Sequence, residues 1–301
     1  MRRRTVCAII LGMSTKEKAF KFLFDNFPGM KISFFGEGWT SVAFLVGDYI
    51  FRFAKEPEYL EKYKTAAKVI SLVRPSLDIP ISGITIVEGQ DLIYTSHHYL
   101  RGNHWSQDEF AKLPADKQDA FVSDCARFLY KMHSMKIDPF TNDKSGKKPK
   151  TPNVVPFDVL ENLMDGRIPK EDLKKIYKKY EDIAGLPANG DKVLLHGDFK
   201  GTNAVVNDDY RLIGVFDFEN AKVGERASEF KYFYSPKNSM FLEKLLAEYK
   251  KLSGIEIDVQ RLRDLCLRDC INGMKNIGRE SLDDIRKSAL DSRAERLLRF
   301  V

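Results

Sequence analysis

The segment Val193–Glu219 is the most informative part of this chain, and it reads VLLHGDFKGTNAVVNDDYRLIGVFDFE. An apolar run leads into a polar loop with Asp198 and Asn203, and a hairpin-like stretch then returns the chain to Asp217. Phosphoryl transfer needs a carboxylate that orients the attacking hydroxyl and accepts its proton, and oxygen ligands for the Mg²⁺ that bridges the phosphates. These three side chains supply those groups, because the loop and the returning hairpin can direct them to one cleft.

The segment resembles the catalytic loop and metal-binding motif of the aminoglycoside phosphotransferase family, which includes macrolide and choline kinases and is similar in fold to protein kinases. The matching stretches are His196 to Asn203 and Asp217-Phe218-Glu219. The resemblance implies Asp198 as catalytic base, Asn203 and Asp217 as Mg²⁺ ligands, and His196 as a residue that braces the loop. Glu219 replaces the glycine that normally ends the motif, so it either adds a metal ligand or perturbs one.

Upstream of this segment, the order of strands and helices predicts an α+β protein with a small sheet-rich lobe before a larger, mainly helical one. Five strands are expected at Ile32–Phe35, Ser41–Val46, Tyr49–Phe53, Ile84–Val87 and Leu92–Ser96, with a helix at Glu58–Leu72. The resemblance implies that these lobes form a two-lobed protein-kinase-like fold with an antiparallel five-stranded sheet. We expect an extension at residues 1–12, a nucleotide-binding lobe at 13–101 and a catalytic and substrate-binding lobe at 102–301.

Two weaker motifs in the first lobe are consistent with nucleotide binding. Gly36, Gly38 and Ser41 belong to a loop between two strands, where backbone amides can cover a triphosphate. Alternation along the next strand places Ile50 and Arg52 on one face, so that Ile50 can pack on the purine while Arg52 reaches the phosphates. Arg52 stands where protein kinases use lysine, and arginine keeps the charge with a bidentate fork.

Four further candidates complete the nucleotide site. Lys55 is a reserve ligand for phosphate, and Glu61 is the candidate carboxylate partner of Arg52, although helical periodicity puts Ala66 nearer the expected position. His98 and Leu100 match the family's interlobe strand, where backbone groups bind a purine edge. The sequence does not distinguish ATP from GTP.

The acceptor site is expected in the second lobe. Lys200 stands where serine/threonine protein kinases carry a lysine that contacts the transferred phosphate, and an exposed loop lysine is an equally weighted alternative. Aminoglycosides are polycations, so a pocket for them needs several carboxylates. The candidates are Glu225, Glu229, Asp264 and Asp269. The acceptor and an antibiotic-modifying role stay open.

Three other functions are considered from the same residues. A protein kinase is favoured by Lys200 but opposed by the absence of a recognisable activation segment after Asp217. A catalytically impaired nucleotide-binding regulator is suggested by Arg52 and Glu219, which depart from the usual motifs. A metal-dependent hydrolase built from His196 and its neighbouring carboxylates leaves the glycine loop unexplained.

Composition limits the partners. The chain has 301 residues and 49 Lys and Arg against 43 Asp and Glu, and its net charge of +6 is too mild for a dedicated nucleic-acid binder. Beyond the short run Val6–Leu11 after Arg2–Arg4, no stretch approaches the roughly 20 apolar residues of a membrane span. The four cysteines show no CxxC spacing, so we expect no disulfide framework and residence in the cytoplasm. The oligomeric state is left open.

Overall fold

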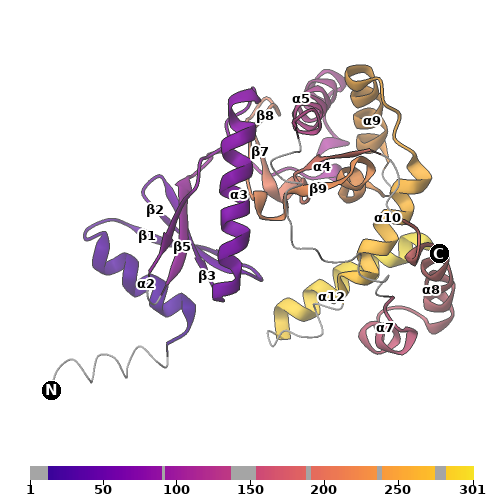
Figure 1. Cartoon of the computed structure of the whole chain (residues 1–301), viewed down its shortest axis with the longest axis horizontal. Coiled ribbons are helices and arrows are strands. Elements are labelled where there is room, and N and C mark those ends of the chain that lie inside the picture. Colours follow the sequence, from indigo (N-terminus) through magenta and orange to yellow (C-terminus); the bar gives the residue numbers. More distant parts are fainter. Residues whose placement is uncertain (1–12, 90–91, 137–153, 188–190, 236–238, 275–282) are drawn as a thin grey trace. The chain divides into compact units, whose positions relative to one another are not determined.

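The computed structural model describes residues 13–89, 92–136, 154–187, 191–235, 239–274 and 283–301 (Figure 1). Contacts between residues divide the chain into two compact units. The first unit comprises Met1–Trp105 and Gly201–Ala221, and the second comprises Ser106–Lys200 and Lys222–Val301. The predicted extension at residues 1–12 lies outside the described residues, and the predicted lobe limits stay a prediction. Within the described stretches, no helix is long and apolar enough to cross a membrane.

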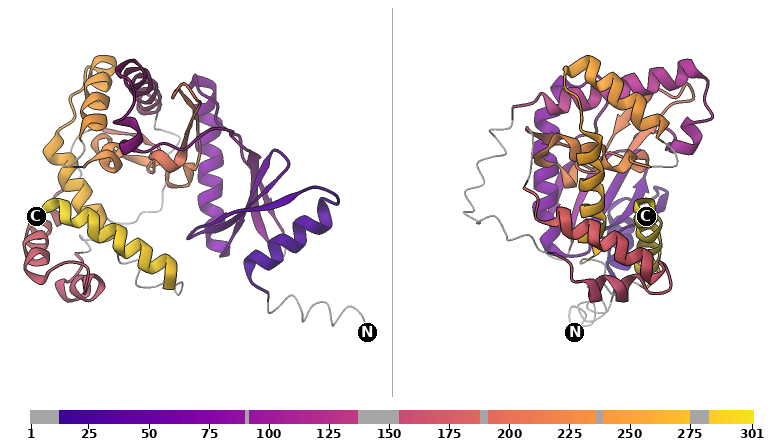
Figure 2. Two further views of the ribbon diagram at one scale, coloured as in Figure 1. Left: turned by 180° about the vertical axis from the view of Figure 1, so that it is seen from behind. Right: turned by 90° about the vertical axis from the view of Figure 1, so that its right-hand side faces the viewer.

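The first unit contains the predicted five-stranded antiparallel sheet, in the strand order β1-β2-β3-β5-β4. Its strands are β1 (Ile32–Glu37), β2 (Ser41–Val46), β3 (Tyr49–Ala54), β4 (Thr85–Glu88) and β5 (Ile93–His98). Helices α2 (Thr15–Asn26) and α3 (Leu60–Val73) lie on opposite sides of this sheet (Figures 1 and 2). A hairpin of β7 (Ala204–Val206) and β8 (Leu212–Val215) also belongs to this unit.

Alternation along β3 decides what each of its side chains meets. Phe51 and Phe53 are buried in a cluster with Leu23 of α2. Ile50 and Arg52 alternate with these phenylalanines and line a pocket on the other face of the sheet. The shared face that the sequence predicts for Ile50 and Arg52 is therefore present.

The second unit is mainly helical, as the sequence predicts. Its helices are α4 (Gln107–Phe110), α5 (Ala115–His133), α7 (Phe157–Met164), α8 (Lys170–Ala184), α9 (Met240–Ser253), α10 (Val259–Asn272) and α12 (Asp283–Leu297). Helices α5 and α9 pack together, and the rings of Phe121 and Phe241 lie 5.7 Å apart in their interface. Antiparallel strands β6 (Lys192–Leu195) and β9 (Lys222–Glu225) form a small sheet, and a 3₁₀ segment, η5 (Arg226–Phe233), follows β9.

Candidate functional site

A pocket in the first unit combines apolar walls with a cluster of charged groups. Side chains from β3, from the segment after β5 and from the β7–β8 hairpin line it; they include Ile50, Leu100, Val205, Phe216, Arg52, Asp217 and Glu219. The apolar walls can accept the flat face of a purine. The charged groups can meet phosphate oxygens or a metal ion.

Arg52 is the cation of this cluster. Its guanidinium lies 3.1 Å from the carboxylate of Asp217 and 2.7 Å from that of Glu219, and it donates to the Ser41 hydroxyl at 3.4 Å. Burial disfavours the charge on Arg52, but the two carboxylates outweigh this effect and raise its pKa above the ordinary value. One positive charge faces two negative charges here, so the cluster has a surplus of negative charge.

The glycine loop is attached to β3 by an ion pair. The N–H of Gly38 donates to the carbonyl of Ser41 at 2.9 Å, and Lys55 pairs with Glu37 at 2.8 Å. A Cβ placed at Gly36 or Gly38 would meet no atom within 4 Å. The loop therefore leaves open space in front of both glycines, while Lys55, the reserve phosphate ligand, is engaged by the loop itself.

Helix α3 does not supply the carboxylate partner of Arg52. The side chain of Glu61 is 79% exposed and pairs with a lysine one turn along the same helix. The α3 residues that line the pocket are Tyr63, Ala66 and Ile70. The pairing of Glu61 with Arg52 considered from sequence is absent, because helical periodicity turns Glu61 away from the pocket.

The segment after β5 reaches the pocket through Leu100. The carbonyl of His98 accepts the hydroxyl of Ser82 at 2.8 Å, and the His98 ring contacts the hydroxyl of Tyr49 at 2.9 Å. The side chain of Leu100 lines the pocket. In the described part of the chain its backbone N–H and carbonyl have no hydrogen-bond partner, so they are available to a purine edge.

His97 is a pocket residue that we did not assign from sequence. Its ring lines the pocket, and its Nδ1 is buried without a hydrogen-bond partner among the described residues. Burial, and then the positive charge of Arg52, lower the pKa of His97 to about 4. The imidazole is therefore neutral at neutral pH. Alternation along β5 could have revealed it, since His97 lies opposite Ile50 in the sheet.

The two predicted metal ligands lie on adjoining segments of the β7–β8 hairpin. The N–H of Phe216 donates to the carbonyl of Asn203 at 3.0 Å, and Asp217 follows directly. Asp217 has a left-handed backbone, with φ 68° and ψ 57°, which costs a non-glycine residue about 1 kcal/mol. Such strain is typical of functional sites. Amide and carboxylate oxygens are hard donors, so this pair fits Mg²⁺, which takes its remaining ligands from water and phosphate.

In the second unit, β6 leads directly into the loop His196-Gly197-Asp198. Glu229 of η5 accepts the N–H of His196 at 2.6 Å and that of Gly197 at 3.1 Å. Burial raises the pKa of Glu229, but a hydrogen bond and the charge of His133 prevail and lower it. Glu229 is 1% exposed and holds the loop backbone, and its role in binding an acceptor stays a prediction. A carboxylate can be buried here because several donors satisfy it.

His196 is a packed, hydrogen-bonded histidine, and Asp198 is flanked by a lysine and a tyrosine. The Nδ1 of His196 accepts the N–H of Asp198 at 3.3 Å, and its ring packs against Phe128. The Nζ of Lys200 lies 3.0 Å from the Asp198 carboxylate. Burial, the charge of Asp198 and a hydrogen bond to its side chain raise the pKa of Tyr232. Nothing in the sequence motif indicated Tyr232.

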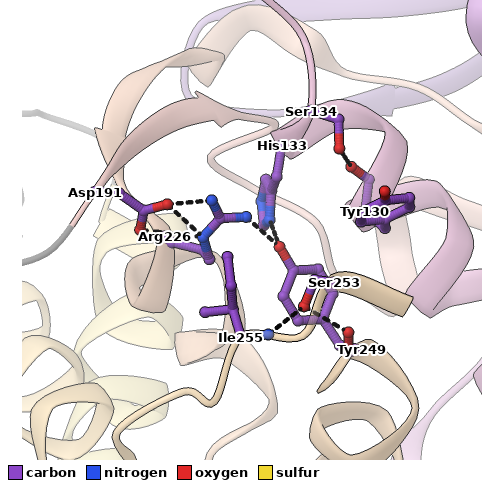
Figure 3. A network of polar contacts seen from close by, with 8 residues as sticks. All are labelled: Tyr130, His133, Ser134, Asp191, Arg226, Tyr249, Ser253 and Ile255. Carbon is purple, nitrogen blue, oxygen red and sulfur yellow. Dashed lines mark hydrogen bonds and ion pairs between the residues drawn. The ribbon is translucent and has the colours of Figure 1, made fainter. Parts of the chain in front are cut away.

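A chain of polar contacts runs from Asp191 through Arg226 and Tyr249 to His133 (Figure 3). Arg226 forms an ion pair with Asp191 and donates to the hydroxyl of Tyr249. That hydroxyl lies 2.8 Å from Nδ1 of His133, whose Nε2 lies 3.7 Å from Glu229. The position of the Asp198 loop therefore depends on a buried network that reaches α9.

The remaining predicted acceptor carboxylates are engaged by other side chains. Arg261 binds both oxygens of Glu225, at 2.7 and 2.8 Å. Lys231 forms an ion pair with Asp269, and its charge outweighs burial and lowers the pKa of Asp269. Asp264 accepts from Gln260 on the same helix at 2.8 Å. Each of the four predicted carboxylates is therefore engaged by another group of the chain.

Comparison with known proteins identifies the family. The model of the phosphotransferase enzyme family matches residues 31–265. The chain belongs to the phosphotransferase enzyme family. Membership makes it an enzyme that transfers phosphate to a hydroxyl group.

Solved structures agree with this phosphotransferase fold. The GDP and kanamycin complex of APH(2")-IIia superimposes with a TM-score of 0.71 at 18% identity, covering 93% of this chain and 98% of that one. The streptomycin-ATP-APH(2")-IIa ternary complex gives 0.64 at 20% identity, with 95% and 99% covered. The macrolide 2'-phosphotransferase MphH from Brachybacterium faecium gives 0.59 at 16% identity, with 93% and 97% covered. The predicted kinase-like fold is confirmed.

Proposed function

We propose that this phosphotransferase moves the γ-phosphate of ATP or GTP to a hydroxyl group of a small molecule. The observation that carries the proposal is the contact of Arg52 with Asp217 inside a pocket that also has apolar walls. A nucleotide needs this combination of a flat apolar surface and charge for its phosphates. The glycine loop and the backbone of Leu100 complete the proposed nucleotide site.

The proposed reaction needs no covalent intermediate. The acceptor hydroxyl oxygen forms a bond to the γ-phosphorus, the bond from that phosphorus to the β-phosphate oxygen breaks, and the nucleoside diphosphate leaves. Asp198 orients the hydroxyl and takes its proton, and Arg52 and Lys200 balance charge on the phosphate oxygens. Mg²⁺, held by Asn203 and Asp217, would neutralise charge on the phosphates.

We propose a sugar- or amine-bearing hydroxyl compound as the acceptor class, of which aminoglycosides are one type. The proteins of similar fold are described with kanamycin and streptomycin, or as macrolide phosphotransferases. These compounds share exposed hydroxyl groups on sugar rings. A panel of acceptors therefore starts from aminoglycosides, macrolides, choline and sugar alcohols.

Metal-dependent turnover tests the proposal. ATP and GTP are supplied separately with Mg²⁺ and each acceptor, and the Asp198→Asn protein serves as the control. We expect transfer to one acceptor class, and about a 1,000-fold loss of kcat in the control because the base is removed. Nucleotide binding should be unchanged in Asp198→Asn. Binding with no transfer to any hydroxyl compound would favour a regulatory protein, and retained turnover in the control would exclude Asp198 as the base.

A further inference from the structure

Three cationic side chains surround the ring of Tyr232 in the second unit. The Nζ of Lys200 lies 5.4 Å from the ring centroid, that of Lys231 lies at 5.0 Å, and the guanidinium carbon of Arg296 lies at 5.8 Å. They come from the catalytic loop, from η5 and from α12. The tyrosine next to the proposed base therefore lies in a positively charged environment.

Two of these cations are balanced by carboxylates. Lys200 pairs with Asp198, and Lys231 pairs with Asp269. Arg296 has a different partner, because its guanidinium lies 3.7 Å from the sulfur of Cys266. No carboxylate of the described residues forms an ion pair with Arg296.

A thiol is a poor partner for a guanidinium, since sulfur is a weak acceptor without charge. Charged side chains withdrawn from water are normally paired. Arg226 and Arg261 of this unit follow that rule, because Arg226 binds Asp191 and Arg261 binds Glu225, whereas Arg293 and Arg299 donate to backbone carbonyls. Arg296 is partly buried and departs from the rule. An unbalanced arginine beside a reactive group is a place for an anionic ligand.

Tyr232 connects Arg296 to the proposed base. Burial of Tyr232, and then the nearby carboxylate of Asp198, raise the pKa of its hydroxyl, whereas the charge of Arg296 opposes that rise. Asp198 and Arg296 therefore both influence the hydroxyl of Tyr232. A small acceptor whose hydroxyl lies at Asp198 can extend along Tyr232 and place a second group at Arg296.

The charge of this region also opposes a polycationic acceptor. Glu225, Glu229 and Asp269 are each held by groups of the chain itself. An aminoglycoside would have to displace those partners or leave its own ammonium groups beside Arg296. Like charges in such proximity repel each other and weaken binding.

We propose that the acceptor is a small hydroxyl compound that carries a carboxylate, and that Arg296 binds this carboxylate while the hydroxyl lies at Asp198. The inference rests on the proposed function and uses the same phosphoryl transfer to the acceptor hydroxyl. The planar fork of arginine matches a carboxylate, and a single unbalanced guanidinium neutralises one charge. A phosphate ester carries nearly two charges at neutral pH, so it fits this site less well. The class includes sugar acids and hydroxy acids.

Matched pairs of acceptors test the proposal. Gluconate is compared with glucitol, and glucuronate with glucose and with glucose 6-phosphate, while kanamycin represents a polycation. Transfer is measured with the native protein, ATP or GTP, and Mg²⁺; binding of each compound is measured by calorimetry with the Asp198→Asn protein and nucleotide. We expect the acid of each pair to have at least a tenfold higher kcat/KM, or a tenfold tighter binding, than its neutral counterpart.

Variants of Arg296 separate a binding role from a role in folding. Arg296→Gln should raise KM for the acid about 30-fold and leave KM for the nucleotide unchanged, and Arg296→Lys should restore part of the loss. Arg263→Gln is the matched control, because Arg263 also lies over an aromatic ring, 5.9 Å from the centroid of Phe300. It removes the same charge and should leave acceptor KM unchanged.

The outcomes distinguish this inference from the proposed function. Preferred transfer to neutral compounds, to glucose 6-phosphate or to kanamycin would contradict the proposed binding of an acceptor carboxylate by Arg296. The phosphotransfer proposal would still stand. The same holds if Arg296→Gln and Arg263→Gln affect KM alike, or if no acid binds or reacts although nucleotide binds. A protein that binds no nucleotide would contradict the proposed function itself.

Discussion

The Arg52 pocket of the first unit and the Asp198 loop of the second carry opposite surpluses of charge. In the first unit, Arg52 faces the carboxylates of Asp217 and Glu219. In the second, Lys200 and Arg296 lie with Asp198 around Tyr232. The negative surplus suits a divalent cation, and the positive surplus suits an anionic group. Each unit can therefore attract a ligand whose charge is opposite to its own surplus.

The first prediction removes the cation from the negative cluster. Arg52→Met leaves the carboxylates of Asp217 and Glu219 close together and only partly accessible to water. Because an unpaired buried charge is costly, we expect the free energy of unfolding to fall by about 3 kcal/mol. Urea denaturation followed by circular dichroism measures this change.

An exposed ion pair of the same unit provides the control. Arg101 is 77% exposed and pairs with Asp48 at its surface. Arg101→Met should leave the free energy of unfolding nearly unchanged, because solvent screens an exposed ion pair. Adding Glu219→Gln to Arg52→Met should recover part of the loss. Equal decreases in the free energy of unfolding for Arg52→Met and Arg101→Met would contradict the prediction, because the two unpaired carboxylates would then cost no stability.

The sequence predicts the strand face on which Arg52 lies, but it does not predict the carboxylate with which Arg52 pairs. Alternation placed Ile50 and Arg52 on one face, because strand periodicity is local. Whether Glu61 or Glu219 reaches Arg52 depends on how α3 is rotated against the sheet and on where the hairpin ends. Those are properties of tertiary packing. The motif shows that Glu219 replaces a glycine, but it does not predict the ion pair of Glu219 with Arg52.

The second prediction adds positive charge to the first unit by lowering the pH. His97 has a pKa of about 4 in the folded protein against about 6.5 in the unfolded chain. The unfolded state therefore binds the proton first, so the stability that His97 provides is complete above pH 6.5 and is lost as the pH falls towards 4. Between pH 7 and pH 5 the loss should be about 2 kcal/mol.

Urea titrations at several pH values measure this effect. His97→Leu should remove that part of the pH dependence, because the leucine cannot bind a proton. His98→Leu, which alters the exposed neighbour, is the control and should retain it. A pH dependence that is identical in the native protein and His97→Leu would mean that His97 is hydrated in solution and does not lie in the apolar pocket.

The partners of the candidate acceptor residues could not be predicted from the sequence for a related reason. The candidates Glu225, Glu229 and Asp269 were chosen from their charge and their position after the motif. Sequence shows that a carboxylate is present but not which cation or backbone amide lies beside it. Arg261, Lys231 and the loop backbone engage them through contacts between distant segments. The fold, by contrast, followed from strand order and one dense motif, which are local features.

The smallest expected effect concerns the tyrosine at the centre of the positive region. Tyr232→Phe keeps the ring beside Lys200 and Arg296 but removes the hydroxyl that hydrogen-bonds to Asp198. We expect kcat to fall about tenfold, because one hydrogen bond to a charged group is lost while all charges stay in place. Steady-state kinetics with saturating nucleotide measure it, with Tyr234→Phe as the control. A loss as large as that of Asp198→Asn would mean that the hydroxyl takes part in proton transfer, and the charges alone would then not explain the site.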